Sequence, residues 1–141
     1  MFVASAVIVR VLFGLFLGLF LAAGGIFFGW FVSPPGASIS TNLLLTFAGL
    51  GAACGAIIGW YKPDVSRGVI AIHLALGPIG GLVGAWAGWE LGNVIYPEGV
   101  YNPAAPVRTP PFMVAVLGAN VLANLVASGF YILRAWRYRE Y

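Results

Sequence analysis

The 141-residue sequence predicts an all-α integral membrane fold with four transmembrane helices and no soluble domain. Only 8% of the residues are charged and 61% are hydrophobic, whereas soluble domains carry about 25% charged residues. Four long apolar runs are separated by short segments rich in proline, glycine and polar residues. Glycine also recurs at every fourth position in two of these runs. We therefore expect residues 1–141 to form a single membrane domain with short loops.

The first apolar run covers residues 11–32 and contains no charge. About 20 such residues span the hydrocarbon core of a bilayer, and the apolar region of a cleaved signal peptide has only about 7–15. The run is therefore predicted to be an uncleaved transmembrane helix. The segment Ser33-Pro34-Pro35-Gly36 follows it and ends the helix.

The second and third helices are predicted over residues 42–60 and 67–96, joined by Tyr61-Lys62-Pro63-Asp64. The third is about 45 Å long at 1.5 Å per residue, which exceeds the hydrocarbon thickness of about 30 Å. Gly77-Pro78 is the expected kink, because proline has no N–H to donate to the Leu74 carbonyl.

The fourth helix is predicted over residues 112–134. The preceding segment, residues 97–111, contains five prolines and should be extended. Orientation follows from the basic residues, because cytoplasmic loops carry an excess of Lys and Arg. Only Arg108 lies on the side opposite to the others in a four-helix topology, so both termini are predicted on the cytoplasmic or equivalent side. The others are Arg10, Lys62, Arg67, Arg134, Arg137 and Arg139.

Glycines four residues apart predict close helix packing of the glycine-zipper type, because residues at this spacing share one helix face. A face without side chains lets a second backbone approach, as in membrane helix pairs. The predicted packing positions are Gly51, Gly55, Gly59, Gly80, Gly84, Gly88 and Gly92. These faces exceed the needs we expect of four short helices, so we also expect them to contact other subunits.

His73 is the candidate cofactor-binding residue, since an ionisable group inside a membrane helix suggests a function. Gly77 and Gly80 share its helix face, and a neutral imidazole beside glycine can ligate haem or chlorophyll. The alternative is a histidine that is hydrogen-bonded to a neighbouring helix or lies near the cytoplasmic headgroups. We favour the second interpretation, because the chain has no other histidine to act as a second axial ligand.

Three further polar residues lie within predicted helices. Glu90 is close to the outer membrane surface and is expected to be protonated, to meet Arg108 or to bind a partner subunit. Asn120 and Asn124 are one turn apart on the fourth helix, where buried amides usually join helices by hydrogen bonds. The alternative is that Glu90 belongs to a transport pathway or that the two asparagines form a substrate site.

We expect no enzymatic activity, because the sequence contains no nucleophile–base pair, metal-ligand cluster or phosphate-binding loop. The expected function is that of a structural or accessory subunit of a larger membrane complex, of respiratory or photosynthetic type. The expected partners are other integral membrane subunits and bilayer lipid, without nucleic acid. One alternative is a small transporter or channel with an unwound Gly77-Pro78 segment. The other is a haem- or chlorophyll-binding subunit that uses His73.

Overall fold

A computed structural model describes the backbone of residues 2–34, 40–61, 66–97 and 110–138, with side chains described for residues 6–34, 40–61, 66–97 and 110–129. These residues form four α-helices, and all four contain a segment long and apolar enough to cross a membrane. The helices are α1 (Phe2–Phe31), α2 (Thr41–Trp60), α3 (Arg67–Ile95) and α4 (Pro110–Tyr138). The described part of the chain contains no strand.

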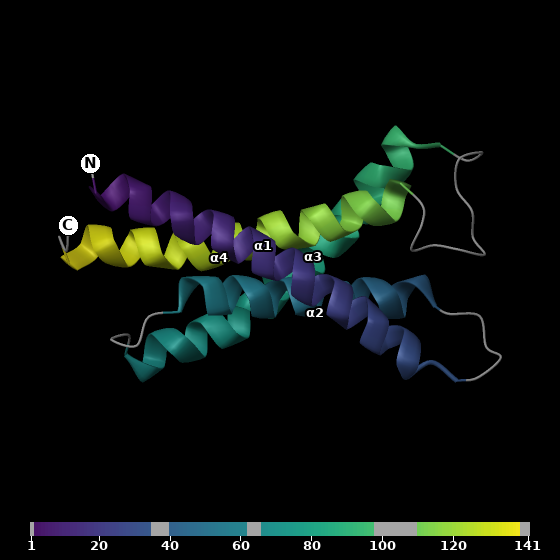
Figure 1. Ribbon diagram of the computed structural model, residues 1–141, viewed down its shortest axis with the longest axis horizontal. Helices are drawn as coiled ribbons and strands as arrows, with labels where there is room; N and C mark the ends of the chain where they lie inside the picture. The colour runs from purple at the N-terminus through teal and green to yellow at the C-terminus, as the bar shows by residue number, and fades with distance from the viewer. Residues whose placement is uncertain (1, 35–39, 62–65, 98–109, 139–141) are drawn as a thin grey trace.

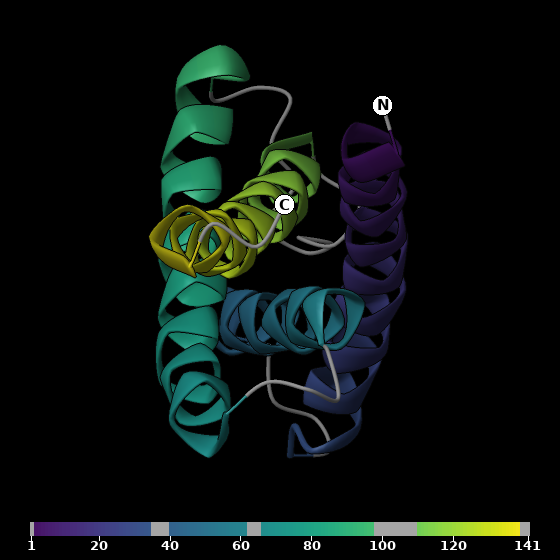
Figure 2. The ribbon, with the colours of Figure 1, turned by 90° about the vertical axis from the view of Figure 1, so that its left-hand side faces the viewer.

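Successive helices run in opposite directions along the long axis of the bundle, which is horizontal in Figure 1. The start of α1 and the end of α4 lie at the same end of the bundle, together with the end of α2 and the start of α3. In Figure 2, α1 and α3 lie on opposite sides, with α2 and α4 between them. The main contacts join α1 to α2 and α3 to α4, and α2 also contacts α3 and α4.

The helix boundaries agree closely with the predicted ones for α2 and α3, and differ for α1 and α4. Helix α1 begins at Phe2 and not at residue 11, and α4 continues to Tyr138 and not to residue 134. Arg10 does not interrupt α1, because arginine is a good helix former; its side chain is partly buried in the bundle. Helix α3 is continuous through Pro78, so the described backbone has no unwound segment there.

Three glycines of α2, Gly51, Gly55 and Gly59, lie against α1. A β-carbon built on Gly59 would lie only 2.6 Å from the Cα atom of Gly14, and one built on Gly55 would overlap the backbone of Gly18. At Gly51 the added atom would overlap the backbone at Leu21. Real β-carbons essentially never come within 3.0 Å of another backbone, so these contacts require glycine.

The four regularly spaced glycines of α3 lie against α4. A β-carbon on Gly84 would overlap the carbonyl oxygen of Gly118, and one on Gly92 would lie 2.6 Å from Pro111 Cα. Equivalent atoms on Gly80 and Gly88 would also press against α4. All seven predicted packing glycines therefore meet another helix of the same chain.

This arrangement corrects our expectation that the glycine faces exceed the internal needs of the bundle. A second glycine face of α3 is also used internally, because a β-carbon on Gly49 of α2 would lie 2.9 Å from the Gly81 carbonyl oxygen of α3. The sequence argument underestimated how many close backbone contacts four tightly crossed helices contain. The glycine spacing consequently gives no evidence for contacts with other subunits.

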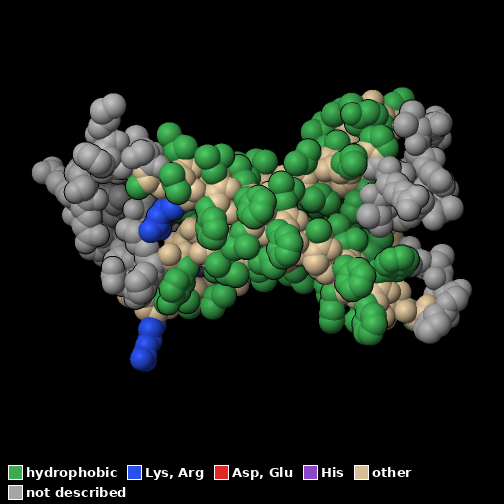
Figure 3. Space-filling view, viewed as in Figure 1, with side chains coloured by type: hydrophobic (Ala, Val, Ile, Leu, Met, Phe, Trp, Pro, Cys, Tyr) green, Lys and Arg blue, Asp and Glu red, His purple; other side chains and the backbone are tan. Residues whose placement is uncertain are grey.

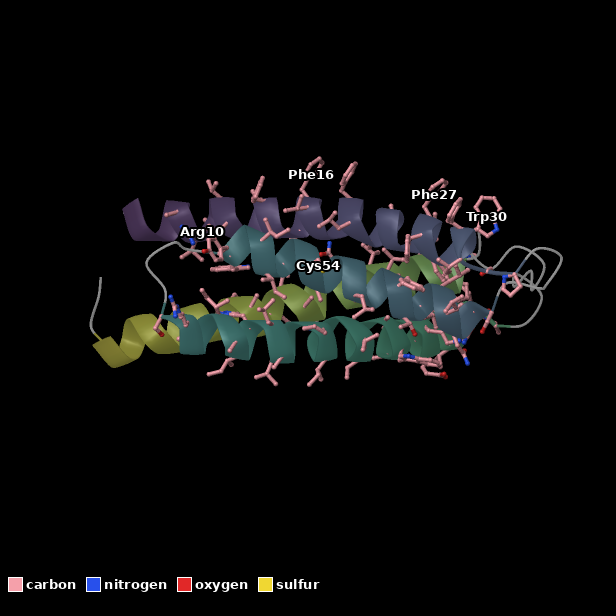
Figure 4. The ribbon with its side chains drawn as sticks, turned by 90° about the horizontal axis from the view of Figure 1, so that it is seen from below. Arg10, Phe16, Phe27, Trp30 and Cys54 are labelled. Atoms are coloured by element: carbon pink, nitrogen blue, oxygen red, sulfur yellow. The ribbon has the colours of Figure 1, made fainter. Side chains whose placement is uncertain are left out.

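The face of the bundle seen in Figure 3 is apolar along most of its length. The Lys and Arg side chains seen in that view lie at one end. On α1, Phe16, Phe27 and Trp30 project away from the other helices (Figure 4) and are 70%, 67% and 60% exposed. Cys54 is an exposed free cysteine of α2. In water, an apolar surface of this extent would be unfavourable.

Candidate functional site: a buried amide cluster

The most polar part of the described interior is formed by Asn120 and Asn124 of α4. Their side chains are 2% and 5% exposed. The Nδ2 group of Asn124 donates to the backbone oxygen of Asn120 at 2.9 Å and to its side-chain Oδ1 at 3.1 Å. The two residues share one face because they are one helical turn apart, as the sequence predicted. They therefore act as one hydrogen-bonded unit.

This amide pair connects α4 to both α1 and α2. Asn120 Nδ2 donates to the carbonyl oxygen of Leu15 in α1 at 2.7 Å. Trp60 Nε1 of α2 donates to Asn124 Oδ1 at 3.3 Å. We use the name amide cluster for Asn120, Asn124, Trp60 and the Leu15 carbonyl. It joins three helices through side-chain hydrogen bonds at a single level of the bundle.

Two glycines of α1 make room for the amide cluster. A β-carbon on Gly18 would overlap Asn120 Oδ1, and one on Gly14 would overlap Asn124 Oδ1. Both glycines are buried, so each amide oxygen lies against bare backbone and Cα–H groups. Such Cα–H···O contacts recur where helices approach closely and add a small attraction.

Sequence reasoning missed Trp60, Gly14 and Gly18 as parts of this cluster. A tryptophan at the end of a membrane helix usually lies at the membrane surface, but the Trp60 side chain is only 4% exposed. The available signal was a matching spacing, because Gly14 and Gly18 are four residues apart, as are Asn120 and Asn124. Two glycines facing two amides at the same interval allow two polar groups to fit at one helix crossing.

The chemistry of the amide cluster is that of hydrogen bonding between helices. Neither asparagine nor tryptophan titrates in the physiological range, and none of the three is a nucleophile. Trp60 Nε1 donates to one amide oxygen, and the other receives a hydrogen bond from its partner amide. Burial of polar groups is tolerated when they are bonded in this way.

His73 lies outside the amide cluster, at the contact between α3 and α4. Its Nδ1 atom is 3.1 Å from the Val69 carbonyl oxygen in the same helix, and its Nε2 atom is 3.3 Å from the Ala127 carbonyl oxygen in α4. A neutral imidazole has one N–H group, so the tautomer decides which carbonyl receives the hydrogen bond. This geometry is that of a histidine bonded to a neighbouring helix, which was one of the two interpretations from the sequence.

Glu90 is not brought together with His73 or with the asparagines. It lies five residues before the end of α3 and is exposed on the side of the bundle. No hydrogen bond or ion pair joins it to another residue in the part of the chain that the structure describes. Arg108, one of its predicted partners, is outside the described residues. Glu90 is therefore an exposed carboxyl group on the side of the mainly apolar helix α3.

Within the described ranges, no three His, Cys, Asp or Glu side chains lie close enough together to hold a metal ion. The polar residues predicted as candidate sites are thus divided among three places: the amide cluster, the α3–α4 contact and the outer side of α3. No protein family model matches the chain, and neither a curated protein nor a solved structure is significantly similar to it.

Proposed function

We propose that this chain is a multi-pass integral membrane protein that serves as a structural or accessory subunit of a larger membrane complex of respiratory or photosynthetic type. Its helices cross the bilayer and pack through their glycine faces in the manner of a glycine zipper. Both termini face the cytoplasmic or equivalent side. Bound lipid and other integral membrane subunits are its partners, and no catalytic step is assigned to it.

Insertion into a bilayer is supported by the apolar surface of all four helices. Large side chains such as Phe16, Phe20 and Phe31 are 68–81% exposed, and lipid covers such groups without the cost they have in water. The helices also satisfy their own backbone hydrogen bonds, as a lipid environment requires.

The main support for the accessory role is that the polar side chains inside the bundle bond to one another and to neighbouring helices. Asn120, Asn124 and Trp60 bond one another or a neighbouring backbone, and His73 contacts carbonyl groups of α3 and α4. A transport pathway needs polar groups that exchange partners with water or a substrate. Polar groups that hold helices together are typical of a rigid packing element.

The two alternatives receive less support. The transporter model relies on an unwound Gly77-Pro78 segment and on asparagines that face water, whereas α3 is continuous and the asparagines are buried. The pigment model relies on a free ring nitrogen of His73, whereas both nitrogens lie within 3.3 Å of a carbonyl oxygen. No specific observation favours either model over the accessory role.

The decisive experiment is extraction of the tagged chain from its native membrane in a mild detergent, followed by intact-mass analysis and an absorption spectrum. An accessory subunit will be found in a particle that contains further integral membrane proteins in fixed ratio. Recovery of the 14.8 kDa chain with lipid alone contradicts the proposal. Substrate flux through liposomes that contain only this chain would support a transporter instead.

A further inference from the structure

Helix α3 carries a regular row of outward-facing side chains. Successive members are separated alternately by four and three residues, which keeps them on one helix face. This spacing is the one that lets a second helix pack at a shallow crossing angle. Its apolar members are 38–53% exposed. We call the row the outer seam of α3; it consists of Ile72, Leu76, Ile79, Val83, Trp86 and Glu90.

The middle of the outer seam forms one wall of an apolar groove of about 420 Å³ between α3 and α4. Leu76, Ile79 and Val83 lie on the α3 side, and Leu125 and Gly129 are on the α4 side. A β-carbon on Gly129 would meet nothing within 4 Å, so this side of the groove is unfilled. The groove provides the recess that bulky side chains of an approaching helix require.

The outer seam ends in a charged group. Glu90 lies nine residues, about 14 Å, from residue 81 at the middle of α3, close to the edge of a hydrocarbon core about 30 Å thick. A carboxylate facing the side of the bundle at this depth loses part of its hydration, and a group of opposite charge compensates for that loss. It therefore favours a neighbour that supplies a positive charge.

We propose that the outer seam of α3 is the docking surface for one transmembrane helix of another subunit, and that this helix carries a Lys or Arg that meets Glu90. The inference rests on the proposed accessory function and identifies the surface through which that function is exerted. Apolar side chains of the partner helix fill the α3–α4 groove. The ion pair at the Glu90 end of the seam fixes the depth and register of the partner helix.

The outer seam does not suit a symmetric contact with a second copy of this chain. Two copies inserted with the same topology lie parallel, and a symmetric seam-to-seam contact then brings Glu90 of one copy to Glu90 of the other. Two like carboxylates at one apolar contact repel each other. A partner with a basic group has the complementary charge, so the contact joins two different chains.

The test compares substitutions on the seam with a matched one elsewhere. Val83→Trp fills the groove and Glu90→Lys reverses the charge, whereas Val9→Trp enlarges a 64% exposed valine on the outer face of α1. Each tagged variant is extracted from native membranes, and the co-purifying integral membrane proteins are quantified by mass spectrometry. The first two should lose one partner by about tenfold, equivalent to about 1.4 kcal/mol, and Val9→Trp should retain it.

Photo-crosslinking covers the case in which a variant fails to fold. A photoreactive amino acid at position 83 of the otherwise unchanged chain should trap the same partner, at a peptide that contains or borders a basic residue, and one at position 9 should not. Equal retention in all variants, or cross-links from position 83 to lipid only, overturns the docking surface and leaves the accessory function standing. A wild-type chain that co-purifies with no protein overturns the accessory function itself.

Discussion

Gly18 of α1 lies directly against the side-chain oxygen of Asn120 in α4, so closely that a β-carbon on Gly18 would overlap that oxygen. The other side of the same segment of α1 meets the glycine face of α2, where Gly55 approaches the Gly18 backbone. One glycine therefore allows three helices to meet at one level. The buried amide of Asn120 can reach the Leu15 carbonyl only because this glycine occupies so little space.

The first prediction concerns Gly18. Gly18→Ala should lower the stability of the bundle in detergent by about 1–3 kcal/mol, since an added methyl in a tight core forces its neighbours apart. The matched control is Gly24→Ala in the same helix, where a β-carbon would meet nothing within 4 Å. The control should change stability by less than about 1 kcal/mol. Equal destabilisation in thermal or steric-trapping measurements would show that the contact at Gly18 is not tight.

The second prediction concerns the contact between α3 and α4. Gly84→Leu should separate these helices, because a β-carbon there would already overlap the Gly118 carbonyl oxygen. Val83→Leu is the neighbouring control, since Val83 is 53% exposed and points away from that contact. Thermal unfolding of the purified protein should show a clear loss of stability for Gly84→Leu and little change for Val83→Leu. Similar values for the two variants would argue against a close α3–α4 backbone contact.

The third prediction tests the amide cluster by a double-mutant cycle. Trp60→Phe removes the indole N–H, and Asn124→Leu removes its acceptor. Hydrogen bonds between helices in lipid contribute about 0.6–2 kcal/mol, so the double variant should be more stable by about this amount than the sum of the single effects indicates. Additive effects of the two substitutions would mean that the Trp60–Asn124 hydrogen bond contributes nothing to stability.

The fourth prediction concerns His73. If its role is contact with the Ala127 carbonyl, His73→Leu should leave the absorption spectrum of the purified protein unchanged and weaken the α3–α4 contact. The expected loss of stability is about 0.6–2 kcal/mol. Loss of an absorption band in the variant would instead assign His73 to a pigment. A metal within about 2.0–2.4 Å of a ring nitrogen would lead to the same conclusion.

The fifth prediction concerns topology. Single cysteines introduced by Tyr101→Cys and Glu140→Cys should react with a membrane-impermeant reagent from opposite sides of the membrane, because six of seven basic residues lie on the side of the termini. Cys54 is exposed on α2, so Cys54→Ser is required as the background. Labelling of both sites from the same side contradicts the four-helix topology.

The sequence was sufficient to predict the number and type of the helices. Bilayer-length apolar runs have few structural alternatives, and Pro and Gly mark the ends of α2 and α3 clearly. The glycine face of α3 and the asparagine pair of α4 were also predicted, because both depend on residues one helical turn apart. The ends of α1 and α4 were misplaced, since a helix can continue past the charged residues that mark an expected membrane boundary.

The tertiary structure alone decided which faces meet. Each helix is apolar around most of its circumference, so hydrophobic periodicity does not show which side is buried. A glycine indicates that something approaches closely, but the partner of Gly84 in α4 and that of Gly49 in α3 depend on the crossing of whole helices. Trp60 illustrates the same limit: a tryptophan at the end of a membrane helix favours a surface indole, whereas the packing of α1 and α4 around Trp60 places its N–H on Asn124.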